Sequence, residues 1–250
     1  MGKVSDYLDR RIRYGPVHLT LIDPDKSPGD HAAKIAVGAV ALGSDAILLG
    51  GSTGISPAKM GEAARAVKSA VQVPVIIFPE GATSLTREAD AVLFMSLLNS
   101  RNLDLVIRLH ARAAPAIRAL GIEPLSLGYL VVAPGMRVGE VGQVDPIPRD
   151  EPELAVGYAL AAEMLGLRML YLEAGSGAPS PVPAEMVKSV RSAVSIPLVV
   201  GGGIRTAEEA GALLSAGAQL LVTGTVTEEE GIGAAFRGIL AEVRRHRGAR

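Results

Sequence analysis

The chain has 250 residues, of which 48% are hydrophobic and 3% aromatic, and its formal net charge is -1. This length suits one (β/α)8 barrel, and nothing in the balanced charge suggests a protein that binds nucleic acid or another polyanion. The chain contains no cysteine, which excludes disulfides, thiolate catalysis and cysteine-ligated metals.

Short apolar runs typical of buried parallel strands recur along the whole chain. They end near Asp23, Gly50, Pro79, Ser96, Ala133, Glu173, Gly201 and Gly224. Segments with helical spacing lie between most of them, at 30–43, 57–71, 103–120, 151–165, 183–194, 206–216 and 228–247. Eight such strand–helix repeats close most simply into an α/β barrel. No linker divides the chain, so we expect a single barrel domain over residues 1–250.

Local signals mark the starts of several predicted helices. Ser56-Pro57 and Ser180-Pro181 each fit an N-cap followed by a first-turn proline. Thr206 and Glu209 have the spacing of a capping box.

One connection is too short for a complete helix. Only about ten residues separate the third strand, at 75–79, from the fourth, at 91–96, whereas a parallel crossover takes about a dozen or more. We therefore expect a modified barrel that lacks a full third helix and exposes apolar surface there. That surface could hold a long hydrocarbon or a second subunit, or a loop could lie over it.

Three glycine-bearing segments follow the last three strands, at 171–177, 201–205 and 224–226. Glycine allows the main chain to approach an anion, and the amides that open the next helix attract negative charge. Three such loops in succession predict a phosphate site at the carboxyl ends of the strands.

Two oxygen-bearing residues follow the first two strands. Asp23 could ligate a hard cation such as Mg²⁺, or it could be an ordinary turn residue. Ser52, in the segment at 50–54, could join the same cation or could simply cap a glycine turn.

The sixth strand supplies two inward-pointing candidates, because Tyr171 and Glu173 alternate with Leu172. Glu173 is the predicted general base, since burial would raise its pKa toward a useful range. The alternative is an ion pair with Lys26 or Arg205. Tyr171 offers a hydroxyl donor at the boundary between apolar and polar regions.

Other residues are predicted to have no chemical role. The four histidines show no metal-ligand spacing, and we expect core or helix-face packing for Met60, Met95, Met164, Met169 and Met186. The run 228–230 is predicted to be the first turn of the last helix, and the run 244–250 a solvated cationic tail. Residues 1–16 lack the apolar segment of a secretion signal, and no apolar run reaches about 18 residues, so we expect a cytoplasmic protein without stable membrane insertion.

The motifs LIDPDK at 21–26, GGSTG at 50–54, LLNSRN at 97–102, YLEAGSGA at 171–178, GGGIRT at 201–206 and GTVTEE at 224–229 together resemble the archaeal geranylgeranylglyceryl phosphate synthase family. Bacterial heptaprenylglyceryl phosphate synthases are its relatives. The resemblance implies a barrel whose missing third helix leaves room for the prenyl chain. It also implies Mg²⁺-dependent transfer of a prenyl group from geranylgeranyl diphosphate to sn-glycerol 1-phosphate. Homo-oligomers, either dimers or hexamers, are implied as well, with at most peripheral membrane contact through the lipid product.

The resemblance also implies roles for individual residues. Asp23 and Ser52 match the Mg²⁺ positions, while the predicted catalytic residues remain those of the sixth strand, Glu173 and Tyr171. The implied substrate-binding positions are Tyr171, Leu172, Glu173, Ala174, Gly175, Ser176, Gly177, Gly202, Gly203, Gly224 and Thr225. The bacterial relatives have Lys and Asn where this chain has Leu21 and Asp25, so the archaeal type and a C20 donor are favoured.

Two other functions remain open at this point. One is a different barrel enzyme acting on a small phosphorylated substrate, such as an isomerase, aldolase or cyclase, because many barrels share phosphate loops after strands seven and eight. The other is a non-catalytic protein that binds a prenyl phosphate.

Overall fold

The computed structural model describes residues 2–51, 55–81 and 84–248. Eight parallel strands close into a barrel in chain order, so the predicted fold class is confirmed. The strands are β1 (Val17–Ile22), β2 (Ala46–Leu49), β3 (Val75–Ile77), β4 (Ala91–Leu97), β5 (Glu123–Val131), β6 (Leu170–Glu173), β7 (Leu198–Gly201) and β8 (Leu220–Thr223).

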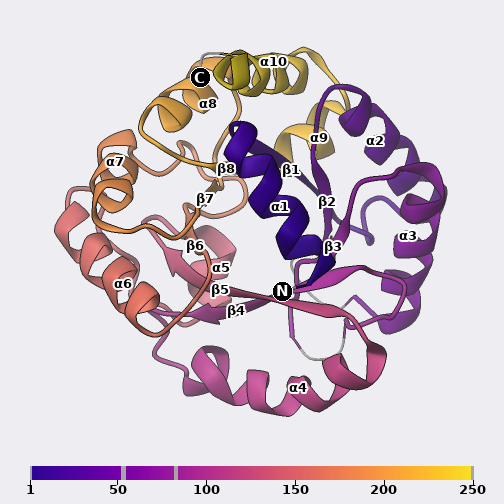
Figure 1. Cartoon of the computed structure of the whole chain (residues 1–250), viewed down its shortest axis with the longest axis horizontal. Coiled ribbons are helices and arrows are strands. Elements are labelled where there is room, and N and C mark those ends of the chain that lie inside the picture. The colour runs from indigo at the N-terminus through magenta and orange to yellow at the C-terminus, as the bar shows by residue number, and fades with distance from the viewer. Residues whose placement is uncertain (1, 52–54, 82–83, 249–250) are drawn as a thin grey trace.

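Helices surround the barrel in a ring, and α1 lies across one of its ends (Figure 1). The α-helices are α1 (Lys3–Tyr14), α2 (Gly29–Ala41), α3 (Pro57–Ala70), α4 (Leu109–Leu120), α5 (Met136–Val141), α6 (Pro152–Met164), α7 (Ala184–Ala193), α8 (Ala207–Ser215), α9 (Thr225–Glu230) and α10 (Ala234–Gly248). A π-helical segment, η1 (Asp104–Arg108), leads directly into α4. None of the helices in the described ranges is long and apolar enough to cross a bilayer.

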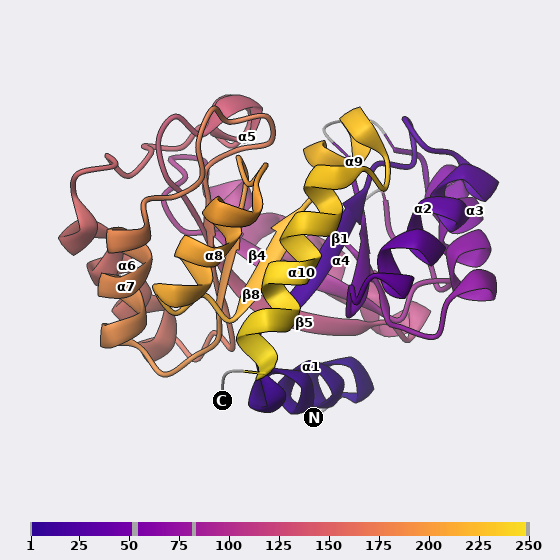
Figure 2. The ribbon, with the colours of Figure 1, turned by 90° about the horizontal axis from the view of Figure 1, so that it is seen from above.

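The two ends of the barrel differ. Figure 2 shows α1 and both chain termini at one end, and α5 and α9 at the other. Leu8 of α1 packs against the residues that fill the barrel interior, so α1 closes the end at which the strands begin. The opposite end, where the strands finish, is left for the functional site. The sequence reasoning did not predict α1 or α5.

The strands place alternate side chains on opposite sides of the barrel wall. Tyr171 belongs to the cluster inside the barrel, whereas Leu172 belongs to the layer between the strands and the outer helices. Both faces are covered, which explains why the strands are almost continuously apolar. The predicted inward direction of Tyr171 is therefore confirmed.

The ring of helices is incomplete between β3 and β4. Residues 78–81 and 84–90 form bends and turns, with no helix among them, while α3 precedes β3 and α4 follows β4. The prediction that a full third helix is missing is confirmed by the described residues of this connection.

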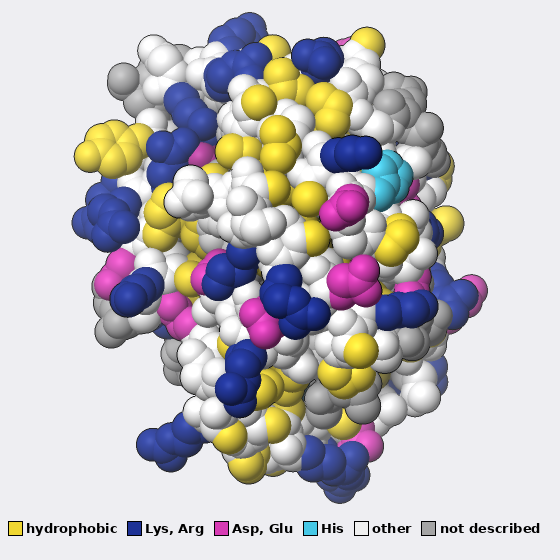
Figure 3. All heavy atoms as spheres, turned by 90° about the vertical axis from the view of Figure 1, so that its right-hand side faces the viewer, with side chains coloured by type: hydrophobic (Ala, Val, Ile, Leu, Met, Phe, Trp, Pro, Cys, Tyr) yellow, Lys and Arg dark blue, Asp and Glu magenta, His cyan; other side chains and the backbone are white. Residues whose placement is uncertain are grey.

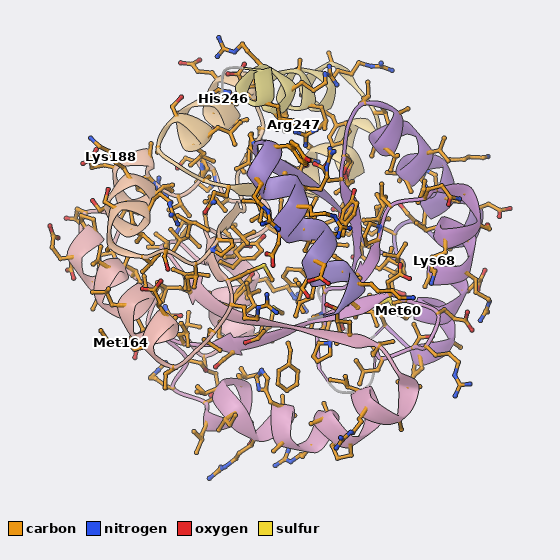
Figure 4. The ribbon with its side chains drawn as sticks, in the orientation of Figure 1. Met60, Lys68, Met164, Lys188, His246 and Arg247 are labelled. Carbon is orange, nitrogen blue, oxygen red and sulfur yellow. The ribbon has the colours of Figure 1, made fainter. Side chains whose placement is uncertain are left out.

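Both chain ends are anchored to one buried carboxylate at the closed end. Asp45 accepts hydrogen bonds from Arg11 of α1 and from Arg247 of α10, and its Oδ2 also accepts the backbone N–H of His18 at 2.9 Å. Arg247 lies beside α1, as Figure 4 shows. The cationic residues at the chain end are thus partly engaged in packing, which the expectation of a solvated tail missed.

Most of the predicted helix starts are correct. Ser56 caps α3 by accepting the Lys59 N–H, and Thr206 forms the capping box with Glu209. The expectation for Ser180-Pro181 is wrong, because α7 begins at Ala184 after an extended Pro183. A proline disfavours helical backbone in the residue before it, so the helix starts only after the last proline of this segment.

The last predicted helix, over 228–247, is also wrong as a single element. Gly231 adopts φ +61 and ends α9, and α10 begins at Ala234. The acidic run 228–230 therefore closes α9 and does not open the long C-terminal helix. A left-handed glycine stops a helix because its backbone leaves the helical conformation without steric cost.

Charged side chains of both signs are scattered over one face of the outer surface (Figure 3). Figure 3 shows the face on the right-hand side of Figure 1, where basic and acidic side chains alternate. On α3, Lys59 and Lys68 pair with Asp25 and Asp90 at 2.8 Å and 2.7 Å.

The methionine side chains divide between the core and the surface. Figure 4 shows Met60 between α3 and the barrel and Met164 on the outside of α6. Met60 is fully buried as predicted, whereas Met164 is 82% exposed. The packing prediction for Met164 is wrong because this last residue of α6 lies on the outer side of the helix (Figure 4).

Candidate active site

A cavity of about 220 Å³ lies at the carboxyl ends of the strands. It brings together most of the residues that the sequence predicted for the site. The predicted residues on its wall are Asp23, Tyr171, Glu173, Ser176, Gly177, Gly202, Gly203, Gly224 and Thr225. Residues from four different strand ends and the loops after them therefore share one space.

Three of the remaining predicted residues contribute differently. Leu172 and Ala174 are fully buried in the outer hydrophobic layer, so only their backbone could meet a ligand. Gly175 uses its N–H to bind Glu173. Ser52 lies outside the described residues.

Glu173 is held by a set of donors that come from three places in the fold. Its Oε1 accepts the Gly175 N–H at 2.6 Å, and its Oε2 accepts the Tyr129 hydroxyl at 3.0 Å. The Tyr171 hydroxyl is hydrogen-bonded to the same carboxyl group. Glu173 is only 5% exposed, and burial raises its pKa although these hydrogen bonds act in the opposite direction. The result is an oriented carboxylate with increased affinity for a proton.

The two phenols beside Glu173 remain protonated. Burial first, and the negative charge of Glu173 second, raise the pKa of Tyr129 and of Tyr171 well above the usual value. Each phenol therefore keeps its proton near neutral pH and can donate a hydrogen bond to Glu173. Tyr129 was missed by the sequence reasoning, although it is paired with Tyr171 in the register of β5 and β6. Reading alternation along β5 would have placed it on the inner face.

The glycines after β7 make room for these side chains. A Cβ on Gly201 would collide with the Tyr171 hydroxyl, and one on Gly202 would collide with Glu173 Oε1. Gly202 and Gly203 also adopt φ +79 and +72, a conformation that L side chains rarely adopt. The Gly-Gly-Gly segment thus makes room for the side chains of Tyr171 and Glu173.

Side-chain contacts join the loops around the cavity mouth. Ser176 after β6 is hydrogen-bonded to Thr225 after β8 at 3.2 Å. Lys26 after β1 pairs with Glu228 of α9 at 2.6 Å. The alternative in which Lys26 neutralises Glu173 is therefore not the arrangement seen here. Two further cations, Arg137 and Arg205, lie on the same wall.

Asp23 has the surroundings of a cation ligand. It is 6% exposed, lines the cavity, and accepts the Asp25 N–H at its Oδ1. A Cβ on Gly51 would lie 2.5 Å from that oxygen, so glycine preserves space in front of the carboxylate. Within the described ranges, no group of three or more acidic, histidine or cysteine side chains could enclose a metal ion. One carboxylate completed by ligand phosphate oxygens is the arrangement that suits Mg²⁺.

A second, largely apolar cavity of about 90 Å³ adjoins the first. The two share Pro79, Glu80 and Met95 on their walls. The second cavity lies between β4 and α4, beside the connection that lacks a helix, and its apolar lining includes Leu85, Phe94, Leu105, Leu109, Ala113 and Ile117. The expected apolar groove is present.

Several lining residues of the main cavity were not predicted as site residues. They include Phe78, Glu80, Met95, Tyr129, Arg137, Val138, Val141, Thr223 and Glu228. Arg137, Val138 and Val141 belong to α5, a helix of six residues that carries no side-chain N-cap signal. Glu228 is not among the predicted site residues because the sequence analysis places the run 228–230 in the first turn of the long last helix.

Comparisons with known proteins agree with this geometry. The PcrB family model matches residues 8–243. The chain is 46% identical to the geranylgeranylglyceryl phosphate synthase of Thermococcus gammatolerans over 92% of each protein. It is 50% identical to the protein of that name from Methanothrix thermoacetophila, over 87% of this chain and 86% of the relative.

Solved structures show the same relationship. The (S)-3-O-geranylgeranylglyceryl phosphate synthase of Thermoplasma acidophilum, in complex with its substrate sn-glycerol-1-phosphate, superposes with a TM-score of 0.93 at 44% identity, covering 98% of this chain and 99% of that one. Thiamine phosphate pyrophosphorylase from Pyrococcus furiosus, at 16% identity and a TM-score of 0.59, shares the barrel fold alone. The match over nearly the whole barrel places this chain in the PcrB family.

Proposed function

We propose that this protein is a Mg²⁺-dependent prenyltransferase that joins geranylgeranyl diphosphate to the C3 hydroxyl of sn-glycerol 1-phosphate. The observation that carries the proposal is that one cavity is lined by Glu173, Asp23 and the predicted phosphate loops, and that an apolar groove adjoins it. The named relatives are geranylgeranylglyceryl phosphate synthases, which supports the same choice.

The reaction exchanges one carbon–oxygen bond for another. The bond between allylic C1 and the diphosphate oxygen breaks, and the electron pair leaves with inorganic diphosphate. The C3 hydroxyl oxygen of the acceptor forms an ether bond to that carbon, and its proton passes to Glu173. Positioning and charge stabilisation supply most of the acceleration, because an allylic carbon ionises readily.

The geometry suits Glu173 for this role as a general base. Its two oxygens are fixed by Gly175 and Tyr129, so the carboxylate cannot rotate away from the acceptor. Its raised pKa improves it as a proton acceptor. The glycine loops at Gly177, Gly203 and Gly224 surround it on the same wall and would bind the acceptor phosphate through their backbone.

Asp23 would hold Mg²⁺ together with Ser52, which the resemblance assigns to the same site. Mg²⁺ bound there supplies positive charge that stabilises the diphosphate as it leaves. Gly51 keeps space in front of the Asp23 carboxylate.

The prenyl chain would extend from the site into the groove between β4 and α4. Burial of each CH₂ group contributes about 0.8 kcal/mol to binding. The groove wall is formed by aliphatic and aromatic side chains such as Phe94, Leu109 and Ile117. Leu21 and Asp25, which differ from the bacterial pattern, favour the C20 donor.

The proposal includes the setting in which the protein works. We infer a cytoplasmic homo-oligomer, either a dimer or a hexamer. Exposed apolar side chains at both ends of α6, Leu154, Met164 and Leu165, support an association surface. Light scattering coupled to size exclusion would measure the mass in solution, and a mass of one chain would contradict the oligomer.

The function is tested by mixing both substrates with purified protein. Mass spectrometry should detect geranylgeranylglyceryl phosphate, and equimolar diphosphate should be released only when Mg²⁺ is present. sn-Glycerol 3-phosphate and the C15 and C35 diphosphates are the matched controls. Binding of the donor without diphosphate release would identify a carrier, and turnover of an unrelated sugar phosphate alone would identify another barrel enzyme.

A further inference from the structure

An ion pair crosses the mouth of the main cavity. Lys26 Nζ lies 2.6 Å from Glu228 Oε2, and both residues line the cavity although 202 positions separate them in the chain. Lys26 belongs to the turn after β1 that carries Asp23, and Glu228 belongs to α9, whose cartoon lies at the open end in Figure 2. The pair therefore connects the turn that carries Asp23 to the last phosphate loop.

Two carboxylates of the protein, Asp23 and Glu228, act on the ammonium group of Lys26. The charge of Asp23 acts on it from its own turn, and its hydrogen bond to Glu228 is the main cause of its raised pKa. On the other side, the Glu228 N–H donates to the Gly224 carbonyl at 3.1 Å, so Glu228 is directly coupled to the phosphate loop. Lys26 remains fully charged near neutral pH.

This ion pair is well suited to exchange. The Lys26 side chain is 55% exposed and that of Glu228 is 22% exposed, and pairs of this kind contribute little to stability. A diphosphate presents more charge and more acceptor oxygens than one carboxylate, so it binds an ammonium group more strongly. Four acidic side chains (Asp23, Glu80, Glu173 and Glu228) and three basic ones (Lys26, Arg137 and Arg205) lie on the described wall. An anionic ligand in this cavity therefore binds more tightly when a basic side chain leaves its carboxylate partner and pairs with the ligand.

We propose that Lys26 is a ligand of the substrate diphosphate and that Glu228 occupies its ammonium group whenever no diphosphate is bound. When diphosphate binds, Lys26 leaves Glu228 for a phosphate oxygen, and the connection between the β1 turn and α9 opens. When inorganic diphosphate leaves, Glu228 takes the ammonium group back. Glu228 thus weakens diphosphate binding and favours product release. The proposal rests on the proposed function only for the identity of the natural diphosphate.

Calorimetric binding of inorganic pyrophosphate tests the exchange without turnover, in Mg²⁺ and separately in EDTA. Lys26→Met should weaken binding about tenfold, because a charge-assisted hydrogen bond to the anion is lost. Glu228→Gln should strengthen binding several-fold, and the double variant should bind like Lys26→Met. Lys59→Met is the matched control: this exposed lysine pairs with Asp25 on the outside of the same turn and is absent from the cavity wall. It should bind pyrophosphate as the unmodified protein does.

Each contrary outcome overturns a specific part. Unchanged affinity in Lys26→Met removes Lys26 as a ligand. Equal strengthening by Glu228→Gln with and without Lys26 shows a general charge effect and no exchange. Thermal melting of each variant establishes that it is folded. If the protein forms no prenyl product but these affinities change as expected, the proposed function fails and the exchange stands. If the protein forms prenyl product but these affinities do not change, the exchange fails and the proposed function stands.

Discussion

Tyr129 donates a hydrogen bond to Glu173 Oε2 over 3.0 Å, from one barrel strand to the next. The register pairs Tyr129 with Tyr171, so the phenol reaches the carboxylate two residues further along β6. The ring of Phe78 makes T-shaped contacts with both tyrosine rings, with centroids 6.0 Å and 6.3 Å away. The orientation of the proposed base is therefore built into the wall of the barrel, and it does not depend on the ligand.

Tyr129→Phe should make turnover more sensitive to acid. The lost hydrogen bond favours the charged carboxylate, so its removal raises the pKa of Glu173 further above the usual value. A hydrogen bond to a charged group contributes about 1.5 to 3 kcal/mol, which corresponds to a shift of about one pH unit or more. The acid limb of the kcat profile should move to higher pH, with rates that converge at alkaline pH. The 75% exposed Tyr14 provides the control Tyr14→Phe, and equal profiles for the two variants would contradict this role.

Glu173→Gln should reduce kcat by about 10² to 10⁴. The amide oxygen of Gln can still accept the Gly175 N–H, so the loop geometry is retained while the base is removed. Calorimetry should show nearly unchanged affinity for sn-glycerol 1-phosphate. Turnover close to that of the unmodified protein would remove Glu173 from the mechanism.

Asp23→Asn should raise the Mg²⁺ concentration required for half-maximal turnover by at least about tenfold. The neutral amide is a poorer ligand for a hard cation. The neighbouring Asp25 points outward to Lys59, so Asp25→Asn is a matched control that should titrate normally. The same response in both variants would argue against a specific metal ligand at position 23.

The barrel itself could be predicted because its strands are nearly continuous apolar runs that end at polar or glycine residues. The position of Glu173 followed from alternation within β6, and the incomplete ring followed from the short connection before β4. These features depend on local spacing alone. The resemblance of the motifs added the substrate classes, which spacing cannot specify.

The parts that could not be predicted depend on contacts distant in sequence. α1 does carry Val4, Leu8 and Ile12 at helical spacing, but only the closed barrel shows what they cover. The place of α5 over the cavity is supported by bridges between Ser100 and Val144 and between Val132 and Ile147. Glu228 reaches the cavity because it belongs to the short helix α9 that directly follows β8, so its ion pair with Lys26 could not be inferred from an acidic run.

Ala113→Phe should shift the donor preference toward a shorter prenyl diphosphate. Ala113 lines the apolar groove from α4, and a phenyl ring there would occupy the space assigned to the distal part of the chain. We expect a higher KM for the C20 diphosphate than for the C15 diphosphate, with the acceptor KM unchanged. Ala114 faces solvent on the same helix, so Ala114→Phe should leave both donor KM values unchanged. An unchanged donor preference in Ala113→Phe would show that the prenyl chain does not occupy this groove.

The buried His18 should make the free energy of unfolding fall as the pH is lowered. It is fully buried, with Ser44 at 3.1 Å from Nδ1 and Thr223 at 3.0 Å from Nε2, and burial, assisted by the charge of Arg247, lowers its pKa to about 3. Between about pH 6.5 and pH 3 the unfolded chain binds a proton that native His18 does not, so the free energy of unfolding falls by up to about 1.4 kcal/mol per pH unit as the pH is lowered. In urea melts at pH 7, 5 and 4, His18→Gln should be less stable at pH 7 but should lose less stability on acidification. His31 is exposed, so His31→Gln should keep the original slope, and a similar slope in His18→Gln would show that other groups govern acid unfolding.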